Sequence, residues 1–204
     1  MPDFACRMNH LQLQVGIGVL GVTWTSSGLL SRMDWLENVG PALAPDAISW
    51  RAVFRGELPE YLGDLLEEVR AYFLRGEPIR AIPWDSLEKS GWTDFQTKVY
   101  SIISTIPHGE TRTYSWVARR IGSGMASRAV GQALRKNPLP ILIPCHRIVG
   151  AAALGGFMGR TDPQQPELLL KRRLLDLEGS FCNPVFPFLT TQWLQQPLSS
   201  ERGA

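Results

Sequence analysis

The sequence of 204 residues contains few cysteines and no long apolar segment. Its three cysteines, Cys6, Cys145 and Cys182, do not make a disulfide framework, which favours a reducing compartment with free thiols. No stretch approaches the roughly 20 apolar residues that span a bilayer, and the N-terminus lacks the basic and apolar segments of a secretory signal. We therefore expect a cytoplasmic protein that does not associate with membranes.

A strong net charge is also absent, but the charge is distributed unevenly. The formal net charge is +2, yet residues 1–90 carry eight basic and twelve acidic side chains, whereas residues 91–204 carry thirteen and seven. Between residues 112 and 147 there are seven Arg or Lys residues and no Asp or Glu. Such a segment is typical of a surface that binds a polyanion. A solvated basic surface without a partner is the alternative.

The beginning of the chain shows the alternation that is typical of β-strands. Leu11, Leu13 and Val15 alternate with glutamines, and the pattern continues over residues 19–25. After a Ser-Ser-Gly turn, a further short strand is predicted over residues 29–35. A loop rich in Pro and Ala follows.

Apolar residues then recur at helical spacing between residues 62 and 73, which predicts a helix that covers the sheet. Residues 76–92 are rich in Gly and Pro and are typical of an interdomain connection. The sequence therefore predicts a small N-terminal α+β domain over residues 1–90.

The second half of the chain has the pattern of a mainly helical domain. Thr93 and Gln96 form a capping-box pattern that predicts the start of a helix. Two short helices are predicted next, over residues 114–121 and 126–136, and the second has a basic face. Two helices joined by a short Gly-containing turn are typical of a helix-turn-helix. This domain is predicted to span residues 91–180, followed by a C-terminal tail over residues 181–204.

The most specific segment lies between Asn137 and Arg147. Three prolines bracket an apolar run there, and because each proline fixes φ and removes a backbone donor, the chain that carries Cys145 is stiff. The thiolate is the nucleophilic form of cysteine, and the adjacent His146 and Arg147 favour it. Sequence neighbours do not easily share a direct hydrogen bond, so we expect a water between Cys145 and His146 and a carboxylate behind the histidine. The alternative is a buried cysteine beside a histidine that only packs.

Residues 143–149, Ile-Pro-Cys-His-Arg-Ile-Val, resemble the active-site motif of the O6-alkylguanine-DNA alkyltransferases. Residues 106–114 and 127–138 are similar to further segments of that family, and the resemblance covers roughly residues 92–179. It implies direct reversal of DNA damage, in which a methyl or other alkyl group moves irreversibly from O6 of guanine to Cys145 in a single turnover. O4 of thymine is a further candidate substrate. The implied partner is double-stranded DNA that carries O6-alkylguanine, bound by a monomer without a cofactor or metal.

The resemblance also implies roles for individual residues. Cys145 is the alkyl acceptor, His146 its base, Glu178 the carboxylate that orients His146, and Tyr114 the donor to guanine N3. Arg128 takes the place of the flipped base in the stack. The residues expected at the DNA are Ala126, Ser127, Arg128, Arg135, Lys136 and Arg147. Those expected around the substrate are Asn137, Val149, Gly156, Phe157 and Met158.

The glycine-rich loop departs from the family pattern. Phe157 stands where members usually carry a tyrosine, and Met158 and Arg160 are bulkier than the usual residues. We expect Met158 to restrict larger alkyl groups and Arg160 to contact a phosphate. The alternative is that both side chains face solvent.

Two other functions and a metal site are alternatives for this sequence. Alkyltransferase-like proteins bind damaged DNA without repairing it and usually carry tryptophan at the acceptor position, which Cys145 argues against. A helix-turn-helix transcription factor leaves the Pro-Cys-His-Arg segment unexplained. Cys6 and His10 have the spacing of half a zinc site, but the other ligands are not evident.

Overall fold

The computed structural model describes residues 8–15, 18–37, 50–51, 58–80 and 82–180. Its N-terminal half contains an antiparallel sheet of four strands in the order β3-β2-β1-β4. The strands are Asn9–Val15 (β1), Gly18–Trp24 (β2), Leu30–Glu37 (β3) and Trp50–Arg51 (β4). The first three confirm the predicted strands. β4 lies where the sequence predicts a loop, so that expectation is wrong for these two residues.

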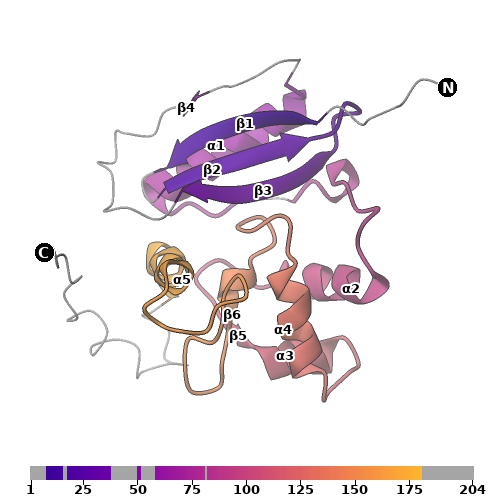
Figure 1. Ribbon diagram of the computed structural model, residues 1–204, viewed down its shortest axis with the longest axis vertical. Helices are drawn as coiled ribbons and strands as arrows, with labels where there is room; N and C mark the ends of the chain where they lie inside the picture. Colours follow the sequence, from indigo (N-terminus) through magenta and orange to yellow (C-terminus); the bar gives the residue numbers. More distant parts are fainter. Residues whose placement is uncertain (1–7, 16–17, 38–49, 52–57, 81, 181–204) are drawn as a thin grey trace, which may run out of the picture.

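One helix covers a face of this sheet, as predicted (Figure 1). It spans Glu60–Arg75 (α1), and all six apolar residues of the predicted stripe are buried. The helix ends at Gly76, whose φ of 66° is left-handed and whose N–H donates to the Tyr72 carbonyl oxygen. Glycine is favoured here because a Cβ is strained in this conformation.

The end of the predicted interdomain connection packs against the sheet. It contains a short 3₁₀ helix, Trp84–Ser86 (η2), and the buried Leu87 after it pairs with Leu30 of β3. The N–H of Glu88 donates to the Leu30 carbonyl oxygen at 2.8 Å. We propose that the division between the two domains lies just after this bridge, near residue 90.

The second half is mainly helical and lies beneath the sheet in Figure 1. Its first helix begins with the predicted capping box, in which the Gln96 N–H donates to the Thr93 hydroxyl and the Thr93 N–H to the Gln96 side-chain oxygen. The elements are Asp94–Ile103 (α2), Arg112–Thr113 (β5), Tyr114–Arg120 (α3), Ser127–Arg135 (α4), Cys145–Arg147 (η3), Ile148–Val149 (β6) and Pro166–Leu177 (α5).

The predicted helix pair is present as α3 and α4. Thr113 caps α3, since its hydroxyl accepts from the Trp116 N–H at 3.2 Å. In α4 the predicted inward residues Val130, Ala133 and Leu134 are buried. The parallel pairing of β5 with β6 places the start of α3 beside the strand that follows Cys145. None of the helices in the described ranges is long and apolar enough to cross a membrane.

Candidate active site

The proline-rich turn before Cys145 is held by one asparagine. The Asn137 side-chain N–H₂ donates to the Ile143 carbonyl oxygen at 2.8 Å, and its oxygen accepts from the Leu139 N–H at 3.0 Å. Within this turn Ile141 has a φ of 79°, which is a strained conformation for a β-branched residue. Backbone strain of this kind is typical of functional sites, where the surrounding structure enforces it.

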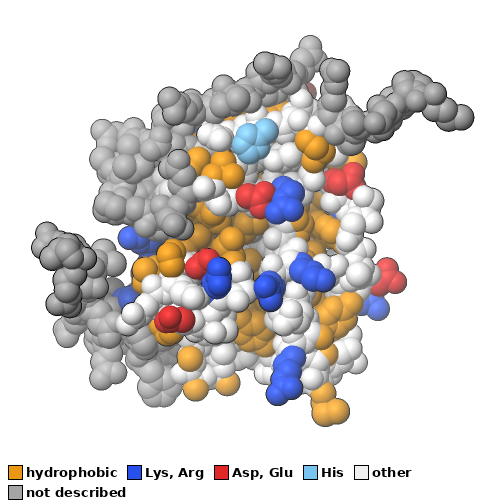
Figure 2. All heavy atoms as spheres, viewed as in Figure 1, with side chains coloured by type: hydrophobic (Ala, Val, Ile, Leu, Met, Phe, Trp, Pro, Cys, Tyr) orange, Lys and Arg blue, Asp and Glu red, His pale blue; other side chains and the backbone are white. Residues whose placement is uncertain are grey.

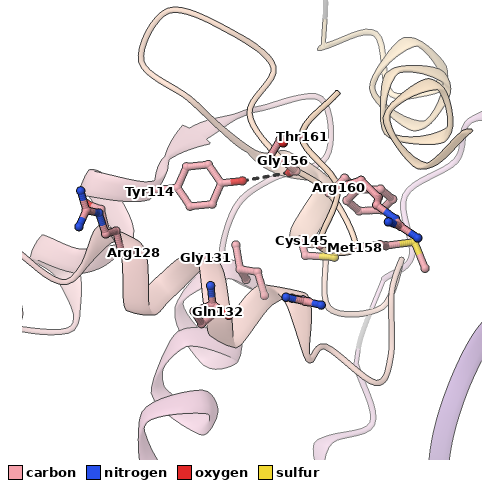
Figure 3. A pocket seen from close by; sticks show the side chains of 14 residues that line it. Tyr114, Arg128, Gly131, Gln132, Cys145, Gly156, Met158, Arg160 and Thr161 are labelled. Atoms are coloured by element: carbon pink, nitrogen blue, oxygen red, sulfur yellow. Dashed lines mark hydrogen bonds between the residues drawn. The ribbon is translucent and has the colours of Figure 1, made fainter. Parts of the chain in front are cut away.

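Cys145 lies at the wall of a cavity of about 400 Å³ between α4 and the loop of residues 150–160, which we call the pocket loop. A cavity of this size is typical of small-molecule sites. Figure 3 shows the cysteine near Met158, with Arg128 far from it at the opposite end of the view. The lining residues are Tyr114, Ser127, Arg128, Gly131, Gln132, Leu134, Arg135, Cys145, Gly156, Phe157, Met158, Gly159, Arg160 and Thr161.

The Cys145 thiol is buried and only 6% exposed. Burial raises its pKa, while the hydrogen bond from Asn137 to Sγ (3.2 Å) and the charge of Lys171 lower it in part. The resting state is therefore a neutral thiol, and a base is needed to withdraw its proton.

His146 is that candidate base. Its ring is fully buried, and Nε2 lies 2.7 Å from Oε1 of Glu178, so the predicted pair is brought together. Burial lowers the pKa of His146, which keeps the ring neutral at rest, and Glu178 acts in the opposite direction. With Nε2–H donating to Glu178, Nδ1 is the acceptor, and no group in the described part of the chain hydrogen-bonds to this buried atom. An uncommitted acceptor is what a general base requires.

Glu178 accepts hydrogen bonds from four residues at once. Besides His146, its carboxylate accepts from the Tyr72 hydroxyl at 2.9 Å, the Gly109 N–H at 3.2 Å and the Arg147 guanidinium at 2.9 and 3.0 Å. Burial alone would raise the pKa of Glu178, but the hydrogen bonds from His146 and Arg147 and the charge of Arg147 hold it well below its usual range. We call Glu178 and these donors the carboxylate cluster.

The placement of Arg147 corrects one prediction. The sequence analysis places it among the DNA-contacting residues, but its side chain is 11% exposed and its guanidinium is engaged by Glu178 and by the Ile106 carbonyl oxygen at 2.7 Å. Because a buried carboxylate needs a permanent counter-charge, Arg147 serves the carboxylate cluster and is not available to phosphates.

A second buried charge, Lys171 of α5, acts on Cys145 and is not anticipated from the sequence. The Lys171 side chain is completely buried, and its Nζ donates to the carbonyl oxygens of Ile148 (2.6 Å), Leu154 (2.7 Å) and Gly156 (3.0 Å). Burial lowers the pKa of Lys171 to about 7. Three carbonyl acceptors favour the charged form, since a neutral amine would turn its lone pair toward an oxygen. We call these groups the ammonium cluster.

Tyr114 connects α3 to the same cluster. Its hydroxyl donates to the Gly156 carbonyl oxygen at 3.0 Å, which is the dashed line in Figure 3. Burial raises the pKa of Tyr114 to about 12, so the hydroxyl stays protonated and able to donate. Gly155 is required next to it, because a Cβ there would lie 3.0 Å from the Tyr114 ring.

The predicted pocket residues divide into two groups. Gly156, Phe157 and Met158 line the cavity, and Met158 adopts a φ of 48° with a 40% exposed side chain. Asn137 and Val149 are not among the lining residues. Asn137 donates a hydrogen bond to Sγ of Cys145. The buried Val149 pairs with Thr113 in the sheet of β5 and β6.

The exposed face of α4 carries the remaining predicted DNA contacts. Arg128, Arg135 and Lys136 are exposed, whereas Ala126 and Ser127 are partly buried at the start of the helix. Figure 2 shows basic side chains along α4, with the acidic side chains of that half to its sides. Arg160 is also exposed, but it is paired with Glu167 at 3.4 Å.

Two predicted features fall partly outside the described residues. Cys6 and Cys182 are not described, and neither is the tail over residues 181–204. His10, the other half of the considered zinc pair, has Nδ1 3.2 Å from the Thr23 hydroxyl. Among the described ranges, no group of three or more His, Cys, Asp or Glu side chains is placed to hold a metal ion.

Comparison with known proteins places these features in a family context. Residues 94–180 match the DNA-binding domain of the 6-O-methylguanine DNA methyltransferases. The methylated-DNA–protein-cysteine methyltransferase of Methanosarcina acetivorans is 38% identical over 128 residues, which are 61% of this chain and 73% of that protein. Its counterpart from Mycobacterium tuberculosis H37Rv is 37% identical over 151 residues, 74% of this chain and 73% of that protein.

Solved structures agree with the sequence matches. The crystal structure of the O6-methylguanine methyltransferase of M. tuberculosis is 30% identical, with a TM-score of 0.63 over 85% of this chain and 94% of that one. A crystal structure of the same mycobacterial protein in complex with DNA has a TM-score of 0.62 at 30% identity, over 83% of this chain and 91% of that one. The similarity therefore includes the N-terminal half, where the family match does not reach.

Proposed function

The chain belongs to the methylated-DNA–protein-cysteine methyltransferase family, and we propose that it repairs O6-alkylguanine in double-stranded DNA by moving the alkyl group to its own Cys145. The observation that carries the proposal is the position of Cys145. Its thiol borders a cavity of about 400 Å³ and is followed directly by a buried histidine that is held by a carboxylate.

In the proposed reaction, the Cys145 proton passes to Nδ1 of His146, directly or through one water, while Nε2–H stays hydrogen-bonded to Glu178. The thiolate Sγ then attacks the alkyl carbon, an S–C bond forms, and the C–O6 bond breaks with its electron pair remaining on guanine. Because the product is a thioether and not a thioester, water does not regenerate the thiol. The protein therefore acts once.

The leaving guanine gains negative charge, which a hydrogen-bond donor at N3 stabilises, and the proton that His146 accepted from Cys145 is finally returned to the base through solvent. We assign the role of this donor to Tyr114, which lines the cavity and whose hydroxyl is kept protonated by a raised pKa. Its present acceptor is the carbonyl oxygen of Gly156, so the hydroxyl has to turn toward N3 of the bound base. Gly156, Phe157 and Met158 form the wall that faces the alkyl group.

A guanine in duplex DNA reaches this cavity only if it is flipped out of the stack, at a cost of a few kcal/mol. The exposed Arg128 at the start of α4 is our candidate for filling the gap, and Arg135 and Lys136 at its end are candidates for phosphate contacts. Ala126 and Ser127 allow the backbone at the start of α4 to approach the DNA. A single chain holds all of these groups, which supports a monomer.

The cytoplasm is the compartment that we propose. The nucleophile is an unpaired cysteine, and a reducing compartment keeps such a thiol available.

Mass spectrometry tests the function directly. The protein is mixed with duplex DNA that contains O6-methylguanine, and the Cys145 peptide should gain about 14 Da, one methyl replacing one hydrogen. A Cys145→Ala variant should bind the DNA without a mass change, and Arg128→Ala should slow methylation from duplex DNA more than from the free base. An unmodified Cys145 peptide after prolonged incubation would contradict the proposal.

A further inference from the structure

The carboxylate cluster contains one group from the N-terminal half of the chain. Tyr72 lies on α1, 106 residues before Glu178, and its hydroxyl donates to Oε1 of Glu178 at 2.9 Å. The same oxygen accepts from Nε2 of the candidate base His146 at 2.7 Å. The helix that covers the N-terminal sheet therefore touches the carboxylate that acts on the candidate base.

The approach of α1 to this cluster is built into the backbone. One turn after Tyr72, Gly76 lies so close to the end of α5 that a Cβ would meet the Leu177 carbonyl oxygen at 2.8 Å. A second segment, between α2 and β5, also reaches Glu178. Its Gly109 donates its N–H to Glu178, and a Cβ there would lie 3.0 Å from the Glu178 carbonyl oxygen. Two glycines thus permit two segments to reach Glu178, one of them α1.

A second contact joins the N-terminal sheet to the active-site turn. The Met33 N–H of β3 donates to the Pro138 carbonyl oxygen at 2.8 Å, next to the Asn137 that supports Cys145. This bond fixes the relative position of the two halves, but it reaches no ionisable group. Tyr72 differs from Met33, because its hydroxyl donates to Glu178, the carboxylate that assists His146 in the proposed reaction.

We propose that Tyr72 is a positioning residue for the transfer reaction, which holds Glu178 and limits how strongly Glu178 assists His146 in withdrawing the Cys145 proton. The inference rests on the proposed function. Three donors share Oε1, namely the Tyr72 hydroxyl, the His146 ring and the Arg147 guanidinium. Hydrogen bonds to one carboxylate oxygen compete for its charge, so the Tyr72 hydroxyl reduces the charge that stabilises a protonated His146.

Removing this hydroxyl should therefore favour the thiolate–imidazolium pair. In Tyr72→Phe the ring remains, and Glu178 is still held by the two bonds from Arg147 and by the Gly109 N–H. The proton should pass from Cys145 to His146 more readily, because imidazolium is then better stabilised. The expected result is a shift of the Cys145 reactivity profile to lower pH.

Other charged and titratable groups around the pair stay in place. Arg147 and Glu178 face His146 within the cluster, and Lys171 of α5 acts on both Cys145 and His146. Tyr114 of α3 and Tyr100 of α2 face Cys145. His108 lies against the Tyr72 ring, with a centroid distance of 6.0 Å, and interacts with Glu178 and Arg147. Burial lowers the pKa of His108, so it is neutral above the acidic range and does not produce the expected shift.

The experiment measures the rate of Cys145 alkylation by iodoacetamide against pH, read from the Cys145 peptide by mass spectrometry. Tyr72→Phe should move the midpoint by about half a pH unit to the acid side, which is roughly a threefold faster reaction below the midpoint. Tyr61→Phe is the matched control, because its hydroxyl on the same helix donates to the Gly28 carbonyl oxygen at 2.6 Å, far from the cluster. Its midpoint should equal that of the parent.

Circular dichroism at each pH checks that both variants stay folded, because an unfolded fraction exposes a thiol without the raised pKa and would itself move the midpoint to the acid side. A midpoint that stays in place, moves to the alkaline side, or moves equally in Tyr61→Phe would overturn the inference. The same proteins are also treated with O6-benzylguanine. If iodoacetamide shows the shift while benzylguanine leaves Cys145 unmodified in the parent, the proposed function fails and the role of Tyr72 in thiol reactivity stands.

Discussion

Two buried side chains of opposite charge contact the residues that directly follow Cys145, and both belong to α5 or its cap. Lys171 and Glu178 are seven residues apart, on α5 and at its C-terminal cap. Three of the four donors to Glu178 are charged or titratable side chains and the fourth is the Gly109 N–H, whereas the acceptors of Lys171 in the described residues are backbone carbonyl oxygens. The carboxylate cluster is therefore suited to moving a proton, and the ammonium cluster to fixing the shape of the pocket loop.

Glu178→Gln should have the largest effect, because it removes the charge of the carboxylate cluster. The amide orients His146 poorly and does not stabilise imidazolium, so the transfer rate should fall about 100-fold, and by the same factor for methylated DNA and free O6-benzylguanine. The uncompensated Arg147 should also cost about 3 kcal/mol in the free energy of unfolding. Single-turnover kinetics and denaturant unfolding measure the two effects.

Glu167→Gln is the matched control for this change. Glu167 lies in the first turn of α5 and pairs with the exposed Arg160, so its loss should leave both the rate and the stability close to those of the parent. A Glu178→Gln variant that transfers at the parent rate would show that Glu178 only neutralises Arg147.

Lys171→Met should reduce the transfer rate less than Glu178→Gln does, and by different factors for the two substrates. The methionine fills the space but leaves the carbonyls of Ile148 and Leu154 without a donor, so the pocket loop loses its fixed position. Reaction with O6-benzylguanine, which needs the whole pocket wall, should slow about tenfold, the cost of roughly one hydrogen bond to a charged group. Methyl transfer should slow less, through the loss of the Lys171 charge that lowers the pKa of Cys145.

Kinetics on both substrates test this, together with amide hydrogen exchange over residues 150–160, which should be faster in the variant. Arg172→Met, the neighbouring substitution on α5, serves as the control. Equal losses on the two substrates would mean that Lys171 belongs with Glu178 in the chemistry and that the two clusters are not distinct.

Acid unfolding gives the smallest expected difference between the clusters. The pKa of Glu178 in the folded protein is held well below its ordinary value of 4.5, so its stabilising contribution is complete above pH 4.5 and is lost as the pH falls toward the folded pKa. In that window the parent should lose up to about 1.4 kcal/mol per pH unit through this group. Glu178→Gln should lack this part of the slope, and Lys171→Met should retain it. Urea unfolding between pH 3 and 6 measures both, and equal slopes in all three proteins would contradict the assignment.

Local patterns in the sequence predict much of the fold and part of the site. Three strands, the helix over the sheet, the Thr93 capping box and the α3–α4 pair all depend on contacts between near neighbours, which periodicity reveals. Cys145 and His146 are evident because the prolines and the adjacent base stand together. Glu178 as the partner of His146 comes only from the family resemblance, since a separation of 32 residues leaves no local signal.

Tyr72 and Lys171 are missed for a related reason. Tyr72 belongs to the apolar stripe of α1, and a tyrosine in such a stripe predicts packing and not a partner 106 residues away. Lys171 does leave a signal, because it falls among the buried Leu168, Leu174 and Leu175 on the inward face of α5. A lysine on the apolar face of a helix indicates a buried acceptor group. The prediction that Arg147 contacts DNA is wrong for a different reason. A basic residue in a basic segment is expected to be exposed, and the sequence gives no sign of its buried partner Glu178.

The most direct test of the account is a count of turnovers. The protein is titrated into an excess of duplex DNA with radiolabelled O6-methylguanine, and label transferred to protein is followed to completion. If Cys145 accepts the alkyl group as a thioether, the label should reach a plateau at one methyl group per active protein, all on the Cys145 peptide. Continued loss of lesions after that plateau, or label on another residue, would contradict the transfer mechanism.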